Sequence, residues 1–265
     1  MQLPLTRVYR FDEEEDKMEK LLVVGDIHGD IKSLKNALAY RSSAGEMEVG
    51  MLFLGDYADR GSNGLEVVET LRKLSYSDDK IILLKGNHEN YTKDGRPTFW
   101  PCDLPNEVEM KLRKSWIDYW NETLKQFFDR LYLAAKLNKI LFIHGGIHSK
   151  LENLDDLENP TPEIEEDILW SDPVTEPGVH PSPRGAGRSF GPDVSMKICE
   201  KLKVDYILRS HEPRKAFYEP FIEHNGRIVT ISSTMIYGGK PHMIELNTRN
   251  LPTNGYELRE SIVYL

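Results

Sequence analysis

One short pattern constrains the fold of this chain more than any other. It is an apolar run that leads within three residues to a carboxylate, an amide or an imidazole, and it is clearest at Met51–Leu54, which precedes Gly55 and Asp56. An apolar run of this length, bounded by glycine, is typical of a buried β-strand. The pattern also follows Leu21–Val24, Ile81–Leu84, Ile140–Ile143 and Tyr206–Leu208. The sequence therefore predicts five buried strands whose carboxyl ends meet at one edge, where α/β sheets bind ligands.

The side chains at these strand ends are the oxygen and nitrogen ligands that hold metal ions. Three are carboxylates or amides and three are imidazoles: Asp26, Asp56, Asn87, His28, His144 and His211. Because none is a thiolate, the set suits manganese, iron or zinc better than calcium or a cysteine-bound structural zinc. Six ligands are too many for one ion with an open position, so we expect two divalent ions. Asp56 is the expected bridge, holding the ions about 3.5–4 Å apart.

The segments between the strands are predicted to be helical where apolar side chains recur every three or four residues. Asp30 can cap a helix in which Ile31, Leu34 and Leu38 share one face. Residues 65–74 repeat that arrangement after the next strand. Helices that follow strands in this way form βαβ units, so we expect a mixed sheet with parallel pairs on its ligand-binding half.

The rest of the chain is predicted to contain two irregular segments and one long helical segment. Residues 90–105 form a polar loop that follows Asn87 closely and is expected to be a substrate-side wall of the site. Residues 107–131 carry apolar and aromatic residues at helical spacing, which predicts an amphipathic helical segment with a buried face. Residues 151–167 are acidic and contain two prolines, which favours an exposed loop. Further elements are predicted at 193–202 for a helix and at 228–232 and 243–246 for strands.

Length and charge exclude several classes of protein. The chain has 265 residues, of which 39% are hydrophobic, enough to bury the core of a single domain spanning 1–265. Its net charge of −9 excludes a nucleic-acid partner. No apolar run approaches the roughly 18 residues of a membrane span, and Met1–Phe11 lacks the core of a signal peptide, so we expect a cytoplasmic protein without membrane attachment. Cys102 and Cys199 lie far apart, as in a reducing compartment, and the acidic run at 12–16 is expected to be solvated.

Five short motifs, taken in order, resemble the signature of a known family: GDIHG, GDYADRG, GNHE, HGG and RSHE. Together they resemble the PPP-type metallophosphoesterases, the protein serine/threonine phosphatases, over residues 21–239. The resemblance implies an α/β, calcineurin-like metallophosphoesterase fold. This fold has a central β-sandwich of mixed sheets flanked by helices, with a dimetal site at the strand carboxyl ends. The resemblance also implies that strands 228–232 and 243–246 lie in a second sheet packed on the first.

The resemblance implies a role for each residue of the site. It assigns one metal to Asp26, His28 and Asp56, and the other to Asp56, Asn87, His144 and His211. His88 becomes the general acid, oriented by Asp59, and the phosphate is bound by Arg60, Arg184 and Asn87. The chemistry of the residues agrees, because an imidazole has the pKa of a proton donor and the arginines carry the charge that a phosphate dianion needs.

The activity implied is that of a metal-dependent protein-serine/threonine phosphatase, with phosphotyrosine as a further candidate substrate. A hydroxide held by both ions attacks phosphorus in line, and the partners are phosphorylated proteins, with no regulatory subunit implied. The alternative is a hydrolase of dinucleoside polyphosphates or phosphodiesters on the same dimetal centre. Tetraphosphate hydrolases typically carry Asn in place of Asp59 and GNHD in place of GNHE, which favours the first function. A non-catalytic scaffold is disfavoured because no ligand is lost.

Three departures from the family pattern bear on regulation. Ala58 replaces a valine, Pro183 precedes Arg184, and Ser232–Gly239 stands where eukaryotic enzymes carry Ser-Ala-Pro-Asn-Tyr. The match of Tyr237 to the family's active-site tyrosine is therefore open, as is the role of Arg188. We expect a stand-alone enzyme of prokaryotic or archaeal style, active with manganese in vitro and with iron or zinc as other candidates. The remaining histidines are expected to be structural: His148, His180, His224 and His242.

Overall fold

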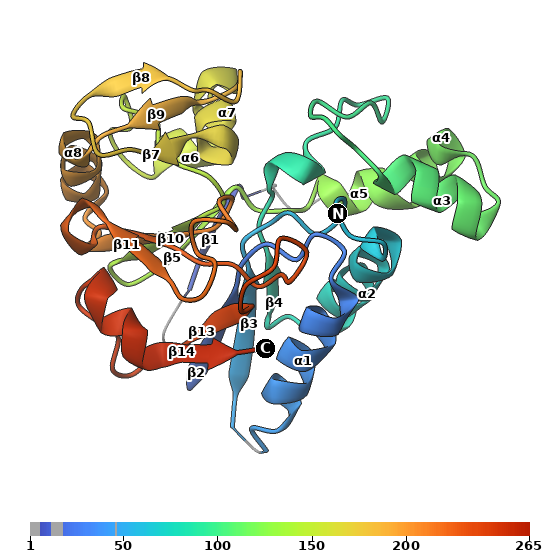
Figure 1. Ribbon diagram of the computed structural model, residues 1–265, viewed down its shortest axis with the longest axis horizontal. Helices are drawn as coiled ribbons and strands as arrows, with labels where there is room; N and C mark the ends of the chain where they lie inside the picture. Colours follow the sequence, from blue (N-terminus) through green and yellow to red (C-terminus); the bar gives the residue numbers. More distant parts are fainter. Residues whose placement is uncertain (1–5, 12–17, 46) are drawn as a thin grey trace.

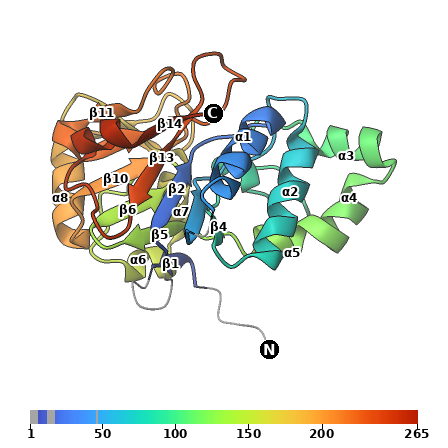
Figure 2. The same ribbon diagram turned by 90° about the horizontal axis from the view of Figure 1, so that it is seen from below.

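Two β-sheets packed face to face form the centre of the computed structural model, which describes residues 6–11, 18–45 and 47–265 (Figure 1). Helices cover the outer face of each sheet, as the view from below also shows (Figure 2). The fold class predicted from the sequence is therefore confirmed. The acidic run at 12–16 lies outside the described residues.

The first sheet has six strands, of which β6, β10 and β12 run parallel to one another. On one side of these strands, β5 pairs antiparallel with β6, and β1 pairs parallel with β5. On the other side, β11 pairs antiparallel with β12 and forms the edge of the sheet. Its strands, in spatial order, are β1 (Val8–Arg10), β5 (Ala134–Leu137), β6 (Ile140–Ile143), β10 (Tyr206–Arg209), β12 (Ile228–Thr230) and β11 (Phe221–Glu223).

The second sheet has five strands, and its parallel part is β2, β3 and β4. Strand β13 pairs antiparallel with β2, and β14 pairs antiparallel with β13. In spatial order the strands are β14 (Ile262–Tyr264), β13 (His242–Asn247), β2 (Lys20–Val24), β3 (Val49–Phe53) and β4 (Ile81–Leu83).

The five strands predicted to end in ligands are divided between the two sheets. Strands β2, β3 and β4 belong to one sheet, and β6 and β10 to the other. The prediction that 228–232 and 243–246 share a second sheet was wrong, because β12 extends the sheet of β10 while β13 extends the sheet of β2. Both segments are short apolar runs, so hydrophobicity alone does not determine which neighbour each one pairs with. Beyond the strand ends, a parallel bridge joins Asp26 to Ser232.

Alternate residues of each central strand face opposite layers. On β2, Leu21 and Val23 pack between the sheets, whereas Leu22 and Val24 pack under the helices. This alternation follows from the two-residue period of a strand, and it explains why these strands read as continuous apolar runs. The helices over the second sheet are α1 (Ile31–Ser42), α2 (Gly64–Ser77), α3 (Leu104–Leu112), α4 (Trp116–Tyr119), the π-helical turn Trp120–Leu124 and α5 (Lys125–Phe128).

Three helices cover the six-stranded sheet: α6 (Asp155–Glu158), α7 (Pro162–Trp170) and α8 (Pro192–Leu202). The expected exposed loop at 151–167 was therefore wrong. Thr161 caps α7 by accepting a hydrogen bond from the backbone N–H of Ile164, and Pro162 occupies the first turn, where a proline costs no hydrogen bond. A small third sheet consists of β7 (Asp172–Pro173), β9 (Arg188–Phe190) and β8 (Val179–Pro181). The remaining short helices are Asn87–Glu89, His224–Gly226 and Gly255–Ser261.

The helical segment predicted at 107–131 is interrupted. Helix α3 ends at Arg113, whose φ of 54° is left-handed, and Ser115 caps the next helix through the backbone N–H of Asp118. Leu112, the last residue before this interruption, is 46% exposed. Among the described residues, no helix is long and apolar enough to cross a membrane.

We expect Leu124→Ala to lower the free energy of unfolding by about 2–5 kcal/mol, because Leu124 is completely buried and its loss leaves a cavity. Leu112→Ala, at a position with the same expected burial from sequence spacing, should cost less than about 1 kcal/mol because Leu112 is exposed. Urea unfolding of both variants measures the difference. Equal losses would contradict the difference in burial between the two side chains.

Candidate metal centre

The loops that follow β2, β3, β4, β6 and β10 bring all six predicted ligands together. Each of the six is at most 5% exposed: Asp26, His28, Asp56, Asn87, His144 and His211. A buried carboxylate is costly unless a cation or hydrogen bonds compensate it. The distances between the ligand atoms show how this site is organised.

One group of ligand atoms surrounds His28. Its Nε2 lies 3.4 Å from Asp56 Oδ2 and 3.9 Å from Asp26 Oδ2. The other ring nitrogen, Nδ1, lies 3.1 Å from the backbone oxygen of Ala58, which orients Nε2 toward the carboxylates. A histidine held at its far nitrogen in this way is typical of a metal ligand.

A second group surrounds His144. Its Nε2 lies 3.0 Å from Asn87 Oδ1, 3.1 Å from His211 Nδ1 and 3.4 Å from Asp56 Oδ1. Its Nδ1 lies 2.8 Å from the backbone oxygen of Leu54. Asp56 therefore presents Oδ2 to the first group and Oδ1 to the second, the arrangement that a bridging carboxylate requires.

The electrostatics of the cluster fit divalent cations. Asp26 Oδ2 and His211 Nε2 are buried without a hydrogen-bond partner among the described residues. Burial, followed by the charges of Asp26 and Glu89, raises the pKa of Asp56. Burial also lowers the pKa of His28 to about 3 and that of His144 to about 4, so both rings are neutral and offer lone pairs. Carboxylates and neutral imidazoles that face one another at these distances are a donor set for hard or borderline cations.

His88 lies against the first group but is held differently. Its ligand atom lies within 4.8 Å of those of His28 and Asp56, so distance alone does not separate it from the ligands. However, its Nδ1 is 2.7 Å from Asp59 Oδ2, and its Nε2 is 3.5 Å from a guanidinium nitrogen of Arg60. Burial alone would raise the pKa of Asp59, but the hydrogen bond from His88 and two backbone N–H groups lower it below its ordinary value.

The two predicted phosphate arginines lie at different places around the cluster. Arg60 contacts His88, and its guanidinium donates to the backbone oxygen of Pro101 at 3.0 Å. Arg184 pairs with Asp172 at 2.5 Å, and Asp172 is also 3.9 Å from His211 Nε2. Both side chains therefore border the ligand groups.

Arg188, whose role the sequence left open, contacts a different set of residues. It lies 3.2 Å from His148 Nε2, 3.8 Å from Asp167 and 3.8 Å from Glu163. These contacts hold β9 against α7. The other three histidines expected to be structural also have hydrogen-bond partners: His180, His224 and His242.

The backbone is strained where the site residues lie. Five of them have a positive φ, which side chains other than glycine rarely adopt: His28 (47°), Asp56 (56°), Asp59 (66°), Arg60 (70°) and His211 (72°). Such residues cost about 1–3 kcal/mol each and cluster at functional sites, where the surrounding structure holds them in place.

Glu89 is a site residue whose role the sequence did not reveal. Its buried carboxylate accepts hydrogen bonds from the backbone N–H groups of Asp56, Tyr57 and Gly86, at 2.8, 2.9 and 3.0 Å. It thereby fixes the loop after β3 to the loop after β4. Gly86 allows this close contact, because a Cβ there would lie 2.3 Å from Asp56 Oδ1. The sequence signals were the position of Glu89 beside His88 and the glutamate of the GNHE motif, and neither shows these backbone contacts.

Two serines and a tyrosine complete the surroundings. Ser210 accepts from the N–H of Asp26, and Ser233 accepts from the N–H of Gly25, both at 2.8 Å. The ring of Tyr237 lies 5.5 Å from that of His28. The ring of Tyr237 therefore borders the first ligand group.

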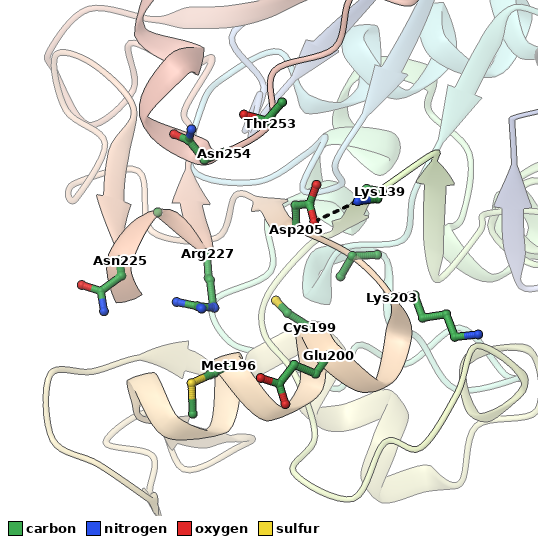
Figure 3. A pocket seen from close by; sticks show the side chains of 12 residues that line it. Lys139, Met196, Cys199, Glu200, Lys203, Asp205, Asn225, Arg227, Thr253 and Asn254 are labelled. Atoms are coloured by element: carbon green, nitrogen blue, oxygen red, sulfur yellow. Dashed lines mark ion pairs between the residues drawn. The ribbon is translucent and has the colours of Figure 1, made fainter.

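A separate hollow of about 480 Å³ lies elsewhere on the molecule (Figure 3). Its lining includes Cys199 and Arg227, together with Lys139 and Asp205, which pair at 3.7 Å. None of the predicted site residues lines it. We therefore assign the chemistry to the strand ends and not to this hollow.

A sandwich of two mixed sheets, with carboxylates and imidazoles gathered at the strand carboxyl ends, defines the class of metal-dependent phosphoesterases. Residues 19–215 match the family described as calcineurin-like phosphoesterase. The chain belongs to this family. Membership implies a site for two metal ions, and the structure provides candidate ligands for that site.

Curated relatives and a solved structure agree with this assignment. Serine/threonine-protein phosphatase T of Aspergillus oryzae is 34% identical over 234 residues, 84% of this chain and 46% of that protein. Serine/threonine-protein phosphatase 5 of Rattus norvegicus is 34% identical over 251 residues, 88% of this chain and 47% of that protein. The chain thus spans about half the length of these relatives. A protein serine/threonine phosphatase from Saccharomyces cerevisiae, with similarity to human phosphatase PP5, shares the fold with a TM-score of 0.74 at 24% identity, covering 99% of this chain and 83% of that one.

We expect the wild-type chain to bind two manganese ions and Asp56→Asn to bind at most one, because the two oxygens of Asp56 face both ligand groups. Elemental analysis after dialysis measures the stoichiometry, and the rise in melting temperature with manganese provides a second reading. Asp94→Asn, at an exposed carboxylate, is the control. Two ions retained in Asp56→Asn would contradict the bridging arrangement.

Proposed function

We propose that the chain is a metal-dependent protein phosphatase that hydrolyses phosphoserine and phosphothreonine. The names of the two curated relatives support the substrate class. The observation that carries the proposal is the pairing of His88 with Asp59 at 2.7 Å, next to two candidate metal sites and Arg60. A poor leaving group such as a serine alkoxide needs a proton donor at this position.

The proposed metal ligands are those predicted from the sequence. Asp26, His28 and Asp56 would hold one ion, and Asp56, Asn87, His144 and His211 would hold the second. When bound, the two ions supply a water acidified to near neutral pKa and positive charge for the phosphoryl oxygens. Manganese or iron fits this mixed oxygen and nitrogen set.

The chain's own residues bind the phosphate and supply the proton. Arg60 and Arg184 hold the phosphoryl oxygens, with Asn87 beside them, and their fixed charge meets the charge that spreads over these oxygens during transfer. Asp172 fixes the Nε of Arg184, and the backbone oxygen of Pro101 fixes Arg60. The guanidinium groups are therefore already ordered when substrate arrives.

His88 donates its proton from Nε2 to the leaving oxygen as the O–P bond breaks. Its Nδ1 is paired with Asp59, which selects the ring orientation and leaves Nε2 free to face the substrate. Asp59 is held in turn by the backbone N–H groups of Asp103 and Leu104, at 2.6 and 2.9 Å. The imidazole of His88 is thus oriented by the carboxylate of Asp59, which is itself oriented by the backbone.

We further propose that residues 1–265 form a single catalytic domain and that the protein is cytoplasmic. The cluster of buried side chains between the two sheets supports the first proposal. The free cysteines Cys102 and Cys199 support the second, because reduced thiols are typical of that compartment.

A substrate panel tests the proposed function. With manganese added, we expect kcat/KM for phosphoserine and phosphothreonine peptides to exceed that for diadenosine tetraphosphate by about tenfold or more. Phosphotyrosine peptides belong in the same panel, because His88 is needed less for a phenolic leaving group. A preference for the tetraphosphate would replace this proposal with the dinucleoside polyphosphate hydrolase.

His88→Asn tests the proton donor. It should retain both metals and lose about 10²- to 10⁴-fold in kcat on alkyl phosphomonoesters, because the leaving alkoxide is no longer protonated. The loss should be much smaller with p-nitrophenyl phosphate, whose leaving group is already stable as an anion. Equal losses on both substrates would remove this assignment, and loss of metal would instead make His88 a ligand.

A further inference from the structure

Arg214 is an exposed arginine close to the proposed metal centre that forms no ion pair in the part of the chain that the structure describes. Its guanidinium carbon lies 5.8 Å from the centre of the Tyr237 ring. A cation over an aromatic face is attracted by the ring, so this contact orients the side chain. An oriented guanidinium whose charge is not neutralised is suited to bind an anion.

Two separate observations place Arg214 beside the site. The centre of the Tyr237 ring lies 5.8 Å from the Arg214 guanidinium and 5.5 Å from the centre of the His28 ring, so Arg214 and His28 are at most about 11 Å apart. Arg214 also follows the ligand His211 by three residues, in a turn that the backbone N–H of Lys215 closes by donating to the backbone oxygen of Glu212 at 2.9 Å. The side chain therefore lies near the first ligand group, and its backbone lies near the second.

The charged side chains around Arg214 do not neutralise it. Apart from Arg214 and Glu219, each charged side chain from 209 to 223 takes part in an ion pair of the described structure: Arg209, Glu212, Lys215 and Glu223. Glu219 makes no ion pair with Arg214, and its charge acts on His242, where it opposes the lowering of the pKa by burial. On the loop that carries Tyr237, the charged side chain is Lys240, which has the same sign as Arg214.

Tyr237 relates Arg214 to a proposed phosphate-binding residue. Burial raises the pKa of the Tyr237 phenol, and the charge of Arg60 partly lowers it. Two arginines therefore adjoin this tyrosine. One of them, Arg60, is assigned to the substrate phosphate, and the other has no partner of opposite charge among the described residues.

The distance between Arg214 and the ligands indicates which part of a substrate it can reach. An extended peptide advances about 3.3–3.6 Å per residue, so a side chain two or three positions from the phosphorylated residue lies about 7–11 Å from it. This range agrees with the upper limit on the separation of Arg214 from His28. A phosphopeptide bound at the metals can therefore present a flanking side chain to Arg214.

We propose that Arg214 is a specificity-determining residue that binds an anionic group two or three positions from the phosphorylated serine or threonine of the substrate. The group is a carboxylate or a second phosphate, because both accept two parallel hydrogen bonds from a guanidinium. This inference rests on the proposed function and adds a sequence preference to it. It is consistent with the net charge of −9, because an acidic protein attracts an acidic peptide only through local positive charge.

The test uses phosphothreonine peptides that differ only at the positions two and three residues from the phosphothreonine. These positions carry alanine, lysine, glutamate or a non-hydrolysable phosphonate analogue of phosphoserine. We expect kcat/KM of the manganese-loaded wild type to be about three- to tenfold higher on the two acidic peptides than on the alanine peptide. The advantage should lie in KM and should shrink as the salt concentration is raised, because the side chain is exposed.

Three variants of Arg214 separate the contribution of its charge. Arg214→Ala should hydrolyse the acidic peptides at the rate of the alanine peptide, and turnover of p-nitrophenyl phosphate should change by less than about twofold. Arg214→Glu should reverse the order, so that the lysine peptide exceeds the glutamate peptide. Arg214→Lys should keep part of the preference, with the larger loss on the phosphonate peptide, because an ammonium group lacks the planar fork of a guanidinium.

A matched control and a binding measurement complete the experiment. Arg249→Ala removes another exposed arginine, whose side chain is 78% exposed and pairs with Glu19, and it should leave the whole panel unchanged. Fluorescence polarisation of labelled peptides, in which a phosphonate replaces the phosphothreonine, measures Kd without turnover. The ratio of Kd between the glutamate and alanine peptides should fall to about one in Arg214→Ala.

The outcome distinguishes the two sources of the anionic group and can overturn the inference. A preference confined to the phosphonate peptide would identify a second phosphate, and an equal preference for glutamate would identify any anionic side chain. An equal loss in Arg214→Ala on every substrate, p-nitrophenyl phosphate included, would make Arg214 a general electrostatic contributor and overturn the inference. So would a wild type that hydrolyses all the phosphopeptides without preference, and this result would leave the proposed function intact. Failure of the wild type on every phosphopeptide would overturn the proposed function itself.

Discussion

The crowding of buried carboxylates against neutral imidazoles is the constraint on which the rest of this structure depends. Asp26 and Asp56 are almost fully buried, and no side-chain cation pairs with either among the described residues. Such a group of like charges and lone pairs is unfavourable unless positive charge is bound among them. The fold therefore positions these side chains to bind cations, and the surrounding hydrogen bonds hold the ligand side chains in place.

Those supports come from both sheets and from strained loops. Glu89 fixes the loop after β3 to the loop after β4, and Ser210, after β10, accepts a hydrogen bond from Asp26, after β2. The positive φ angles at Asp56 and His211 are kept by these contacts. The energy stored in the loops is offset by burial of the apolar residues between and outside the sheets.

The sequence was sufficient for the parts of the molecule that depend on short-range pattern. Apolar runs located the buried strands, and Asp30 located the start of α1, whose cap it forms through Ser33. Sequence spacing could not show how strands pair, so β12 and β13 were assigned to one sheet although they extend different ones. It also could not show the left-handed turn at Arg113, because the apolar period continues across the interruption. In the site, the sequence was enough to predict the types of metal ligand. It could not predict that Glu89 joins two loops, because that role depends on backbone groups that are distant in sequence.

The ligand-bearing strand ends are divided between two sheets, and this division affects how the protein unfolds. Ions shared between donors on β2, β3 and β4 and donors on β6 and β10 would couple metal affinity to the docking of one sheet on the other. The bridges Asp26 to Ser232 and Leu84 to Tyr132 are backbone connections at the same end. Chelation would therefore loosen the sandwich from this end inward, and amide hydrogen exchange would rise first at the carboxyl ends of the central strands while their amino ends stay protected.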